Sequence, residues 1–299
     1  MEILRSYSLL VFAVFLSPTV AYQATANPAF QTAPVQQQVH HHDFWHKPRT
    51  PAEVKAHVQN CLAQVDYDTS SGSLASSKSE VEVISAEPPL VVVHNFISTS
   101  KCDDIIETAK SRDMMRSTIG STQSTSSIRT SSTVWLRDED CAEPLRLIAE
   151  KVSSISGLPP TNMENLQVVR YQEGQQFEVH TDHQDSFNDL ERRGRLATCL
   201  VYLNEPEQGG ETWFPGLEEL HQAHGNYYGQ RITVTPRRGS AIFFWNTIEK
   251  PGCYGYTPDM FLNTDLRMKH AGLPVTGGEK WVCNRWVHPI DFQAGVRGF

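Results

Sequence analysis

The strongest constraint on the fold of this chain is a series of short apolar runs after Glu164. Gly and Pro residues separate these runs. The runs are LQVVRY (166–171), QFEVHTD (176–182), RLATCLVYL (195–203), RITVTP (231–236), SAIFFWNT (240–247) and KWVCNRWVH (280–288). Runs of this length, rich in β-branched and aromatic residues and bounded by turn formers, are typical of β-strands. Many short strands in succession favour a sandwich or barrel of the jelly-roll type.

Helical patterns precede these strands. Apolar residues recur at helical spacing in three segments, and Thr50 and Pro51 suit the cap and first turn of the first one. The segments are 50–65, 99–112 and 142–157, with a further strand expected at 88–98. We therefore expect an α+β protein with a double-stranded β-helix (jelly roll) core and supporting N-terminal helices.

The N-terminal region differs in composition from the rest. In residues 1–22, Arg5 precedes an apolar run and then small residues, which is the layout of a secretory signal peptide or, if uncleaved, a membrane anchor. Residues 23–85 are rich in Gln, Pro, His and Ser, which predicts a low-complexity linker with one short helix. The resulting division is 1–22, 23–85, a main domain at 86–290 and a C-terminal tail at 291–299.

Charge and cysteine content exclude two classes of protein. The net charge is -8 and no basic run stands out, so we expect no nucleic-acid partner. None of the 6 cysteines forms a CxxC pair, so a zinc ribbon is excluded. Six cysteines allow about 15 disulfide connectivities, and the sequence selects none. We expect Cys199 and Cys283, which lie in apolar runs, to be buried thiols.

The run FEVHTDH (177–183) concentrates metal-binding side chains in a strand-like segment. Side chains two residues apart on a strand share a face, so His180 and Asp182 converge, whereas His183 points to the opposite face. Imidazole and carboxylate suit a divalent transition metal, but two ligands hold one poorly. A third ligand must come from elsewhere in the chain.

The third ligand that we predict is His270. It is followed by AGLPV, a Gly-Gly-Glu turn and a strand that opens with Lys280, whose cation can hold a carboxylate. Two His and one carboxylate with open positions are typical of non-haem Fe(II) oxygenases. Alternation along the last strand puts Lys280 and His288 on one face, so we expect both to look into the same cavity.

At this point the sequence resembles a known family, the prolyl 4-hydroxylases of the Fe(II) and 2-oxoglutarate-dependent dioxygenase superfamily. The resemblance extends from about Pro88 to His288, so it identifies the main domain as an Fe(II)/2-oxoglutarate dioxygenase domain. It is carried by four ordered motifs, namely LQVVRYQEGQQFEVHTDH, RLATCLVYLNEPEQGGETWFP, PRRGSAIFFWNT and KHAGLPVTGGEKWVCNRWVH.

The resemblance implies a role for each matching residue. His180, Asp182 and His270 match the family's iron ligands. Lys280 matches the residue that pairs with the distal carboxylate of 2-oxoglutarate, and Tyr171 matches a tyrosine that hydrogen-bonds the same cosubstrate. The remaining matches concern the peptide: Arg195 and His288 align with positions implicated in its binding or turnover, and Arg129 with a loop that covers it.

The implied reaction is hydroxylation of a substrate C–H bond with Fe(II), O2 and 2-oxoglutarate, and with L-ascorbate keeping the iron reduced. Three alternatives stay open. One is a 2-oxoglutarate oxygenase that acts on another peptide residue or on a small molecule. The second is a non-catalytic jelly-roll binding module. The third is a zinc hydrolase with the same ligands, although nothing nearby suggests a general base and Lys280 would then have no role.

The resemblance also implies a proline-containing peptide or protein substrate, hydroxylated at C4 of proline. One departure bears on this expectation: Phe177 stands where the family usually carries a tyrosine, so the ring is kept and a hydroxyl is lost. Together with the signal-like N-terminus, the family suggests the secretory pathway, in the lumen or the membrane of the endoplasmic reticulum. The C-terminal GVRGF is no luminal retention signal, and the sequence does not determine the oligomeric state.

Overall fold

A computed structural model describes most of the chain after residue 44. The described residues are 45, 47, 49–68, 73–74, 78–117, 129–183, 194–225, 229, 231–248 and 263–292. The chain divides into Met1–Thr32 and Ala33–Phe299, and all described residues belong to the second unit. The predicted signal or anchor at 1–22 lies outside the described residues. Among the helices of the described part, none is both long and apolar enough to cross a membrane.

The described unit is built on an antiparallel sheet of eight strands, in the order β3-β4-β13-β9-β18-β7-β6-β5. Their bounds are β3 Glu80–Ala86, β4 Pro89–His94, β13 Ala241–Trp245, β9 Ala197–Tyr202, β18 Lys280–Val287, β7 Leu166–Tyr171, β6 Ser132–Leu136 and β5 Met115–Arg116. Most predicted strands are therefore neighbours in one sheet, although they are far apart in the sequence.

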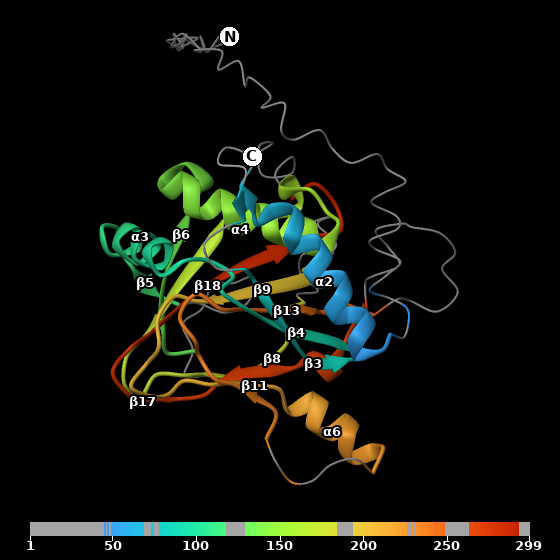
Figure 1. Ribbon diagram of the computed structural model, residues 1–299. Helices are drawn as coiled ribbons and strands as arrows, with labels where there is room; N and C mark the ends of the chain where they lie inside the picture. The colour runs from blue at the N-terminus through green and yellow to red at the C-terminus, as the bar shows by residue number, and fades with distance from the viewer. Residues whose placement is uncertain are drawn as a thin grey trace, which may run out of the picture. The chain divides into compact units, whose positions relative to one another are not determined.

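A smaller sheet of four strands faces the large one across a shared core (Figure 1). Its order is β12 Thr233–Val234, β11 Thr212–Trp213, β16 His270–Gly272 and β8 Phe177–His180. Short pairs lie outside both sheets: β1 Tyr67–Asp68 with β2 Ser73–Leu74, β10 Gln208–Gly209 with β17 Val275–Gly277, and β14 Thr247–Ile248 with β15 Asn263–Thr264. Two facing antiparallel sheets agree with the predicted jelly roll.

Helices cover the other face of the large sheet (Figure 1). They are α2 Pro51–Val65, α3 Thr99–Lys110 and α4 Ala142–Ser156, while α6 Pro215–Ala223 follows the smaller sheet. The predicted start of α2 is confirmed: the Glu53 backbone N–H donates to Thr50 Oγ1, and the Thr50 N–H donates to Glu53 Oε2. The α+β class is therefore confirmed.

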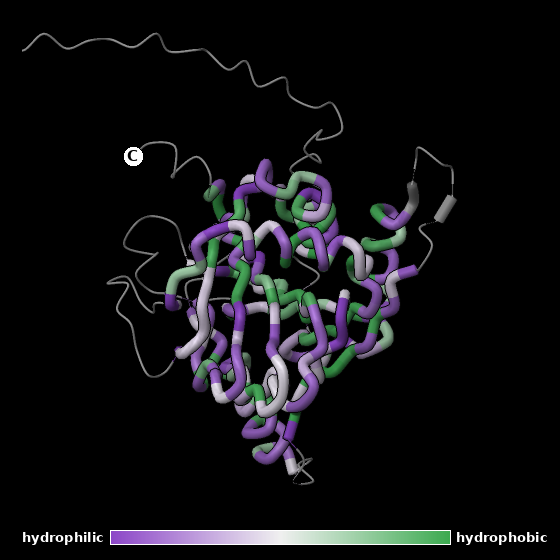
Figure 2. The backbone as a smooth tube through the Cα atoms, turned by 90° about the vertical axis from the view of Figure 1, so that its left-hand side faces the viewer, coloured by the Kyte–Doolittle hydropathy of each residue, from purple (hydrophilic) through white to green (hydrophobic). Residues whose placement is uncertain are grey.

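Alternation along the strands gives the unit two cores. In β4, Val91 and Val93 pack under the helices, whereas Leu90 and Val92 pack between the two sheets. Figure 2 shows that hydrophobic and hydrophilic positions both occur along the strands. Cys199 and Cys283 belong to the core beneath the helices and are free thiols, as predicted.

The predicted start of the main domain at residue 86 is wrong. Strand β3 begins at Glu80 and pairs with β4, and the buried side chains of α2 join the core beneath the helices. Trp45 reaches the same core, where its Nε1 donates to the Ile155 carbonyl at 2.9 Å. The sequence concealed this boundary because an edge strand needs only one apolar face, so the segment EVEV resembles a polar linker.

A buried ion pair ties this early segment to α4. Lys151 Nζ lies 2.6 Å from Asp66 Oδ1 and donates to the Phe96 carbonyl at 2.7 Å and to Ser79 Oγ at 3.1 Å. The Ser79 backbone N–H donates in turn to Asp66 Oδ2. The described residues of the region predicted as a linker are thus part of the folded unit from α2 onward.

Candidate active site

The predicted metal ligands meet in the smaller sheet. Strand β16 pairs with β8 so that His270 lies opposite His180, and Asp182 follows His180 by two residues. One ligand atom from each residue can be chosen such that all three lie within 4.8 Å of one another. Among the described residues, this group of His, Cys, Asp or Glu side chains is the one arranged to hold a metal ion.

Backbone carbonyls fix the tautomer of both histidines. Nδ1 of His180 donates to the Glu178 carbonyl at 2.7 Å, and Nδ1 of His270 donates to the Met268 carbonyl at 3.0 Å. A carbonyl only accepts, so the proton of each neutral ring lies on Nδ1 and the lone pair on Nε2. Both Nε2 atoms face Asp182: that of His180 lies 3.6 Å from Oδ1, and that of His270 lies 3.7 Å from Oδ2.

Electrostatics keep these side chains in the form that binds a cation. Burial opposes ionisation of Asp182, but the neighbouring His270 and His180 hold its pKa well below its ordinary value. Burial and the proximity of His180 lower the pKa of His270 to about 4. At neutral pH the site therefore presents one carboxylate and a neutral His270.

Sequence reasoning missed the groups that hold Asp182. Its Oδ2 accepts a hydrogen bond from Thr198 Oγ1 at 2.8 Å and another from Trp286 Nε1 at 3.0 Å. Asn246 Nδ2 donates to Thr198 Oγ1 at 2.8 Å. Trp286 shares the face of Lys280 on β18. The alternation of side chains along this strand could therefore have predicted that Trp286 belongs to the site.

Lys280 lies at the start of β18, opposite Tyr171 of β7. The side chain is buried, and its Nζ lies 5.4 Å from the ring centroid of Tyr171 and 5.5 Å from that of Tyr202. Burial lowers the pKa of Lys280 to about 7, and the charge of Glu211 offsets this in part. A Cβ at Gly210, where φ is +77°, would come within 3.1 Å of the lysine Cδ, so this glycine leaves room for the chain.

Thr212 is hydrogen-bonded to Tyr202, one of the two tyrosines beside Lys280. Its Oγ1 lies 2.7 Å from the hydroxyl of Tyr202, which joins the smaller sheet to the large one. Neither Tyr202 nor Thr212 was among the predicted site residues. The result is a buried cation flanked by two tyrosine rings, a setting that suits a carboxylate ligand.

Arg129 is buried and forms an isolated bridge with Phe177, and the residues that precede it in the predicted covering loop, 118–128, lie outside the described residues. Arg129 Nη2 donates to Gln167 Oε1 at 3.0 Å and its Nε to Ser131 Oγ at 3.4 Å. The guanidinium lies 4.7 Å from the ring centroid of Phe177, and this ring stacks on His180 at 3.6 Å with an interplanar angle of 17°. Phe177 therefore acts through its ring as a platform between the arginine and a metal-site histidine.

Arg195 and His288 are joined by Glu164, a residue that sequence reasoning missed. Arg195 donates to both carboxylate oxygens of Glu164, at 2.6 and 3.0 Å, and His288 Nε2 lies 2.8 Å from Oε1. Burial would raise the pKa of Glu164, but the Arg195 charge and the contact with His288 lower it to about 2. Arg195 also stacks on Trp286, with its Cζ 3.5 Å from the ring centroid.

His288 lies just beyond the end of β18, and its place in one cavity with Lys280 stays a prediction. The imidazole is fully buried against Glu164 and stacks on Phe292 at 4.3 Å. Strand β18 ends at Val287, so the alternation that places Lys280 does not extend to the next residue. Eight residues also separate the two along an extended strand, about 26 Å at the usual rise.

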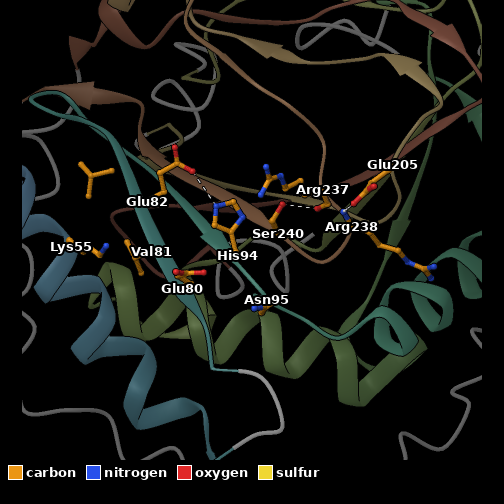
Figure 3. Close-up of a pocket in the computed structure, with 11 residues that line it drawn as sticks. Lys55, Glu80, Val81, Glu82, His94, Asn95, Glu205, Arg237, Arg238 and Ser240 are labelled. Carbon is orange, nitrogen blue, oxygen red and sulfur yellow. Dashed lines mark hydrogen bonds and ion pairs between the residues drawn. The ribbon is translucent and has the colours of Figure 1, made fainter.

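A hollow of about 620 Å³ opens beside strands β3 and β4, away from the predicted site residues (Figure 3). There His94 Nε2 and Glu82 Oε2 point toward each other at 3.1 Å. Its charged lining is balanced between Glu80, Glu82 and Glu205 and the cations of Lys55, Arg237 and Arg238. None of the predicted site residues lines it, and its mixed charges favour no ligand class.

Comparison with known proteins agrees with this geometry. The family model described as 2OG-Fe(II) oxygenase superfamily matches residues 166–288, a range that contains the three metal-site residues and Lys280. This defines the class of protein: a dioxygenase that uses Fe(II), 2-oxoglutarate and O2.

More specific relatives define the family. Over 244 residues the chain is 34% identical to Prolyl 4-hydroxylase 5 of Arabidopsis thaliana, covering 76% of this chain and 77% of that protein. It is 35% identical over 229 residues to Probable prolyl 4-hydroxylase 8 of the same plant, covering 71% and 73%. The chain belongs to the prolyl 4-hydroxylase family, which confirms the resemblance found in the sequence.

A solved structure supports the fold assignment. The 2OG complex of the viral collagen prolyl hydroxylase vCPH from Paramecium Bursaria Chlorella virus-1 is 28% identical, with a TM-score of 0.51. The match covers 67% of this chain and 96% of that one. The predicted jelly-roll core is confirmed by this likeness and by the two facing sheets.

Proposed function

We propose that this protein hydroxylates proline residues of peptide or protein substrates at C4, with Fe(II), O2 and 2-oxoglutarate. The observation that carries the proposal is the presence, within the matched family region, of a three-ligand metal site and of a buried lysine ammonium that forms no ion pair with a described residue. A binding module has no evident need for both features. The names of the relatives support proline as the target.

The residues present fit the metal and the cosubstrate. His180 Nε2, His270 Nε2 and Asp182 would hold Fe(II), a donor set that leaves positions open and suits non-haem iron. Lys280 would hold the distal carboxylate of 2-oxoglutarate, with Tyr171 donating a second hydrogen bond. The bound iron supplies the activation of O2 with the cosubstrate.

The chain's own residues orient the reactants. The Nδ1–H bonds of both histidines hold the rings toward the metal position, and the Phe177 ring covers one face of His180. The buried position of Lys280 keeps water away from the cosubstrate carboxylate. Through Glu164, Arg195 and His288 fix the wall next to Trp286, and in this proposal that wall, with Arg129, borders the peptide.

An aromatic surface beside the centre suits a proline-rich chain. Trp135 of β6 is 42% exposed, and its ring centroid lies 5.8 Å from that of Trp286. The indole N–H of Trp286 donates to Asp182. Extended polyproline II segments dock on aromatic-lined grooves and lose little entropy on binding. Phe177 lacks the hydroxyl of the family tyrosine, a loss worth about 1 kcal/mol if that hydroxyl bonds the substrate.

One incubation tests the proposal. The protein, Fe(II), 2-oxoglutarate and L-ascorbate are mixed with proline-rich, collagen-like and proline-free peptides, and mass spectrometry detects the gain of one oxygen. We expect oxidation at proline C4 with stoichiometric succinate. Oxidation at another residue or of a free small molecule would favour the broader oxygenase, and peptide binding without succinate would favour the binding module.

We also propose that the protein acts in the secretory pathway, in the lumen or the membrane of the endoplasmic reticulum. The signal-like residues 1–22 support this. Protease protection and carbonate extraction of a tagged protein distinguish the lumen from a membrane anchor. A fusion that is diffuse in the cytosol would contradict the proposal.

A further inference from the structure

The two oxygens of Asp182 have different environments. Oδ2 accepts hydrogen bonds from Thr198 Oγ1 at 2.8 Å and from Trp286 Nε1 at 3.0 Å. Each oxygen also faces a metal-site histidine, Oδ1 at 3.6 Å from His180 Nε2 and Oδ2 at 3.7 Å from His270 Nε2, so the two oxygens differ in their hydrogen-bond donors. A carboxylate oxygen has two lone pairs, so the two donors occupy the acceptor capacity of Oδ2 and leave that of Oδ1 for a cation.

The donors to Oδ2 are themselves fixed. Thr198 and Asn246 are buried, and the Asn246 amide donates to Thr198 Oγ1 at 2.8 Å. Because the threonine oxygen accepts from the amide, its single proton is directed to Asp182. Thr198 also lies opposite Trp286 in the β9–β18 register, so the large sheet sets the spacing of the two donors.

Packing restrains the indole as well. Trp286 is 4% exposed. The Cζ atom of Arg195 lies 3.5 Å from the centroid of its ring, and the ring centroid of Trp135 lies 5.8 Å away. Glu164 holds Arg195 through two hydrogen bonds. Rotation of the indole away from Asp182 would therefore disturb a buried ion pair, which is costly.

We propose that Thr198, Trp286 and Asn246 are positioning residues that make Asp182 a one-oxygen ligand and thereby keep a coordination position open for the cosubstrate. The inference rests on the proposed iron site. Without the two donors, the carboxylate rotates and coordinates through both oxygens, which removes one open position. The metal still binds, but 2-oxoglutarate then competes with Oδ2 for its second contact.

The test uses the full chain loaded with Mn(II) in place of iron, without turnover. Water-proton relaxation measures the exchangeable waters on the bound ion, and titration measures the dissociation constant of 2-oxoglutarate. For wild type we expect about three waters, the positions that three ligands leave in an octahedral ion. Thr198→Val and Trp286→Phe should each lose about one water and bind 2-oxoglutarate on the order of 10-fold more weakly. Asn246→Ala should show the same changes in smaller degree.

Matched controls separate positioning from general damage. Thr198→Ser keeps the hydroxyl and should restore wild-type values. Thr247→Val makes the same substitution at a buried threonine near Asn246, and Trp281→Phe removes an indole donor on the opposite face of β18. Both should match wild type, and thermal unfolding of each protein shows which variants are folded.

The outcomes are distinct. A wild-type water count in folded Thr198→Val and Trp286→Phe overturns the inference and leaves the proposed function intact. Weaker Mn(II) binding with an unchanged water count also overturns it, since the donors would then serve affinity alone. A wild-type protein that binds no Mn(II) refutes the metal site itself, and with it the proposed function and this inference.

Discussion

The two ends of the active site differ in how far the protein satisfies its own charges. At the metal end, Asp182 accepts two hydrogen bonds and both histidines donate to carbonyls. At the other end, the Lys280 ammonium lies between two tyrosine rings, and no ion pair joins it to a described residue. The metal end has its side chains oriented before a metal binds, whereas the lysine end lacks a counter-charge until an anion binds.

The difference shows which part of the site costs folding free energy in the absence of ligand. Satisfied side chains hold the metal position without help from the ligand. A buried ammonium without a counterion destabilises the fold, and burial accordingly lowers the pKa of Lys280. The cosubstrate carboxylate supplies the missing charge, so cosubstrate binding and charge compensation are one event.

Removal of a metal ligand should have the largest effect. We expect His180→Ala or His270→Ala to abolish metal binding and turnover, because two remaining ligands hold Fe(II) poorly. Succinate release and Mn(II) titration measure the two effects. His94→Ala, at a histidine that pairs with Glu82 in the hollow beside β3 and β4, should retain activity. Succinate release by His180→Ala at the wild-type rate would refute the oxygenase assignment.

Removal of the lysine charge should affect the cosubstrate and leave the metal bound. We expect Lys280→Met to raise the KM for 2-oxoglutarate about 10- to 100-fold, the usual worth of a charge-assisted hydrogen bond. Mn(II) affinity should be unchanged, as should the KM of Lys269→Met, whose lysine pairs with Glu219 at the surface. Equal loss of metal and cosubstrate binding would show that the two ends are not independent.

A dependence on pH should follow from the lysine pKa of about 7. Only the ammonium pairs with the carboxylate, so binding of 2-oxoglutarate takes up a proton above that pH. The KM should be lowest below pH 7 and should rise above it by up to about tenfold per unit. Initial rates over a pH series measure this slope, and Lys280→Met should lack it. A flat profile in wild type would mean that the free enzyme keeps this lysine charged.

The smallest effect concerns stability without ligand. The folded pKa of Lys280, about 7, lies below the ordinary 10.5, so between these values the unfolded chain holds the proton and the folded one does not. Stability therefore rises with pH across this window, and the burial cost is fully present below pH 7. At pH 6 we expect Lys280→Met to raise the Tm by on the order of 5 °C. The gain should shrink toward pH 10, and a lower Tm at pH 6 would contradict the prediction.

Local patterns predicted the elements and part of the site. Alternation predicted most strands and placed His180 and Asp182 on one face. The ordered motifs added His270, Lys280 and Tyr171. These residues could be predicted from the sequence because each is identified by its own short segment.

The missed residues depend on strand pairing between distant segments. Thr198 meets Trp286 because β9 and β18 are neighbours in a particular register, and Asn246 reaches them from the end of β13. Glu164 precedes its strand, so no periodicity marks it as the partner of Arg195. No local rule of the sequence fixes such non-local registers.

Trp45 has a consequence for how the protein can be shortened. Its indole bonds the Ile155 carbonyl and packs against Phe243 and Trp245. A shortened chain should therefore keep this residue. A chain cut at residue 86 would lack β3 and α2, leaving an apolar sheet face and an open strand edge, the two features that drive aggregation.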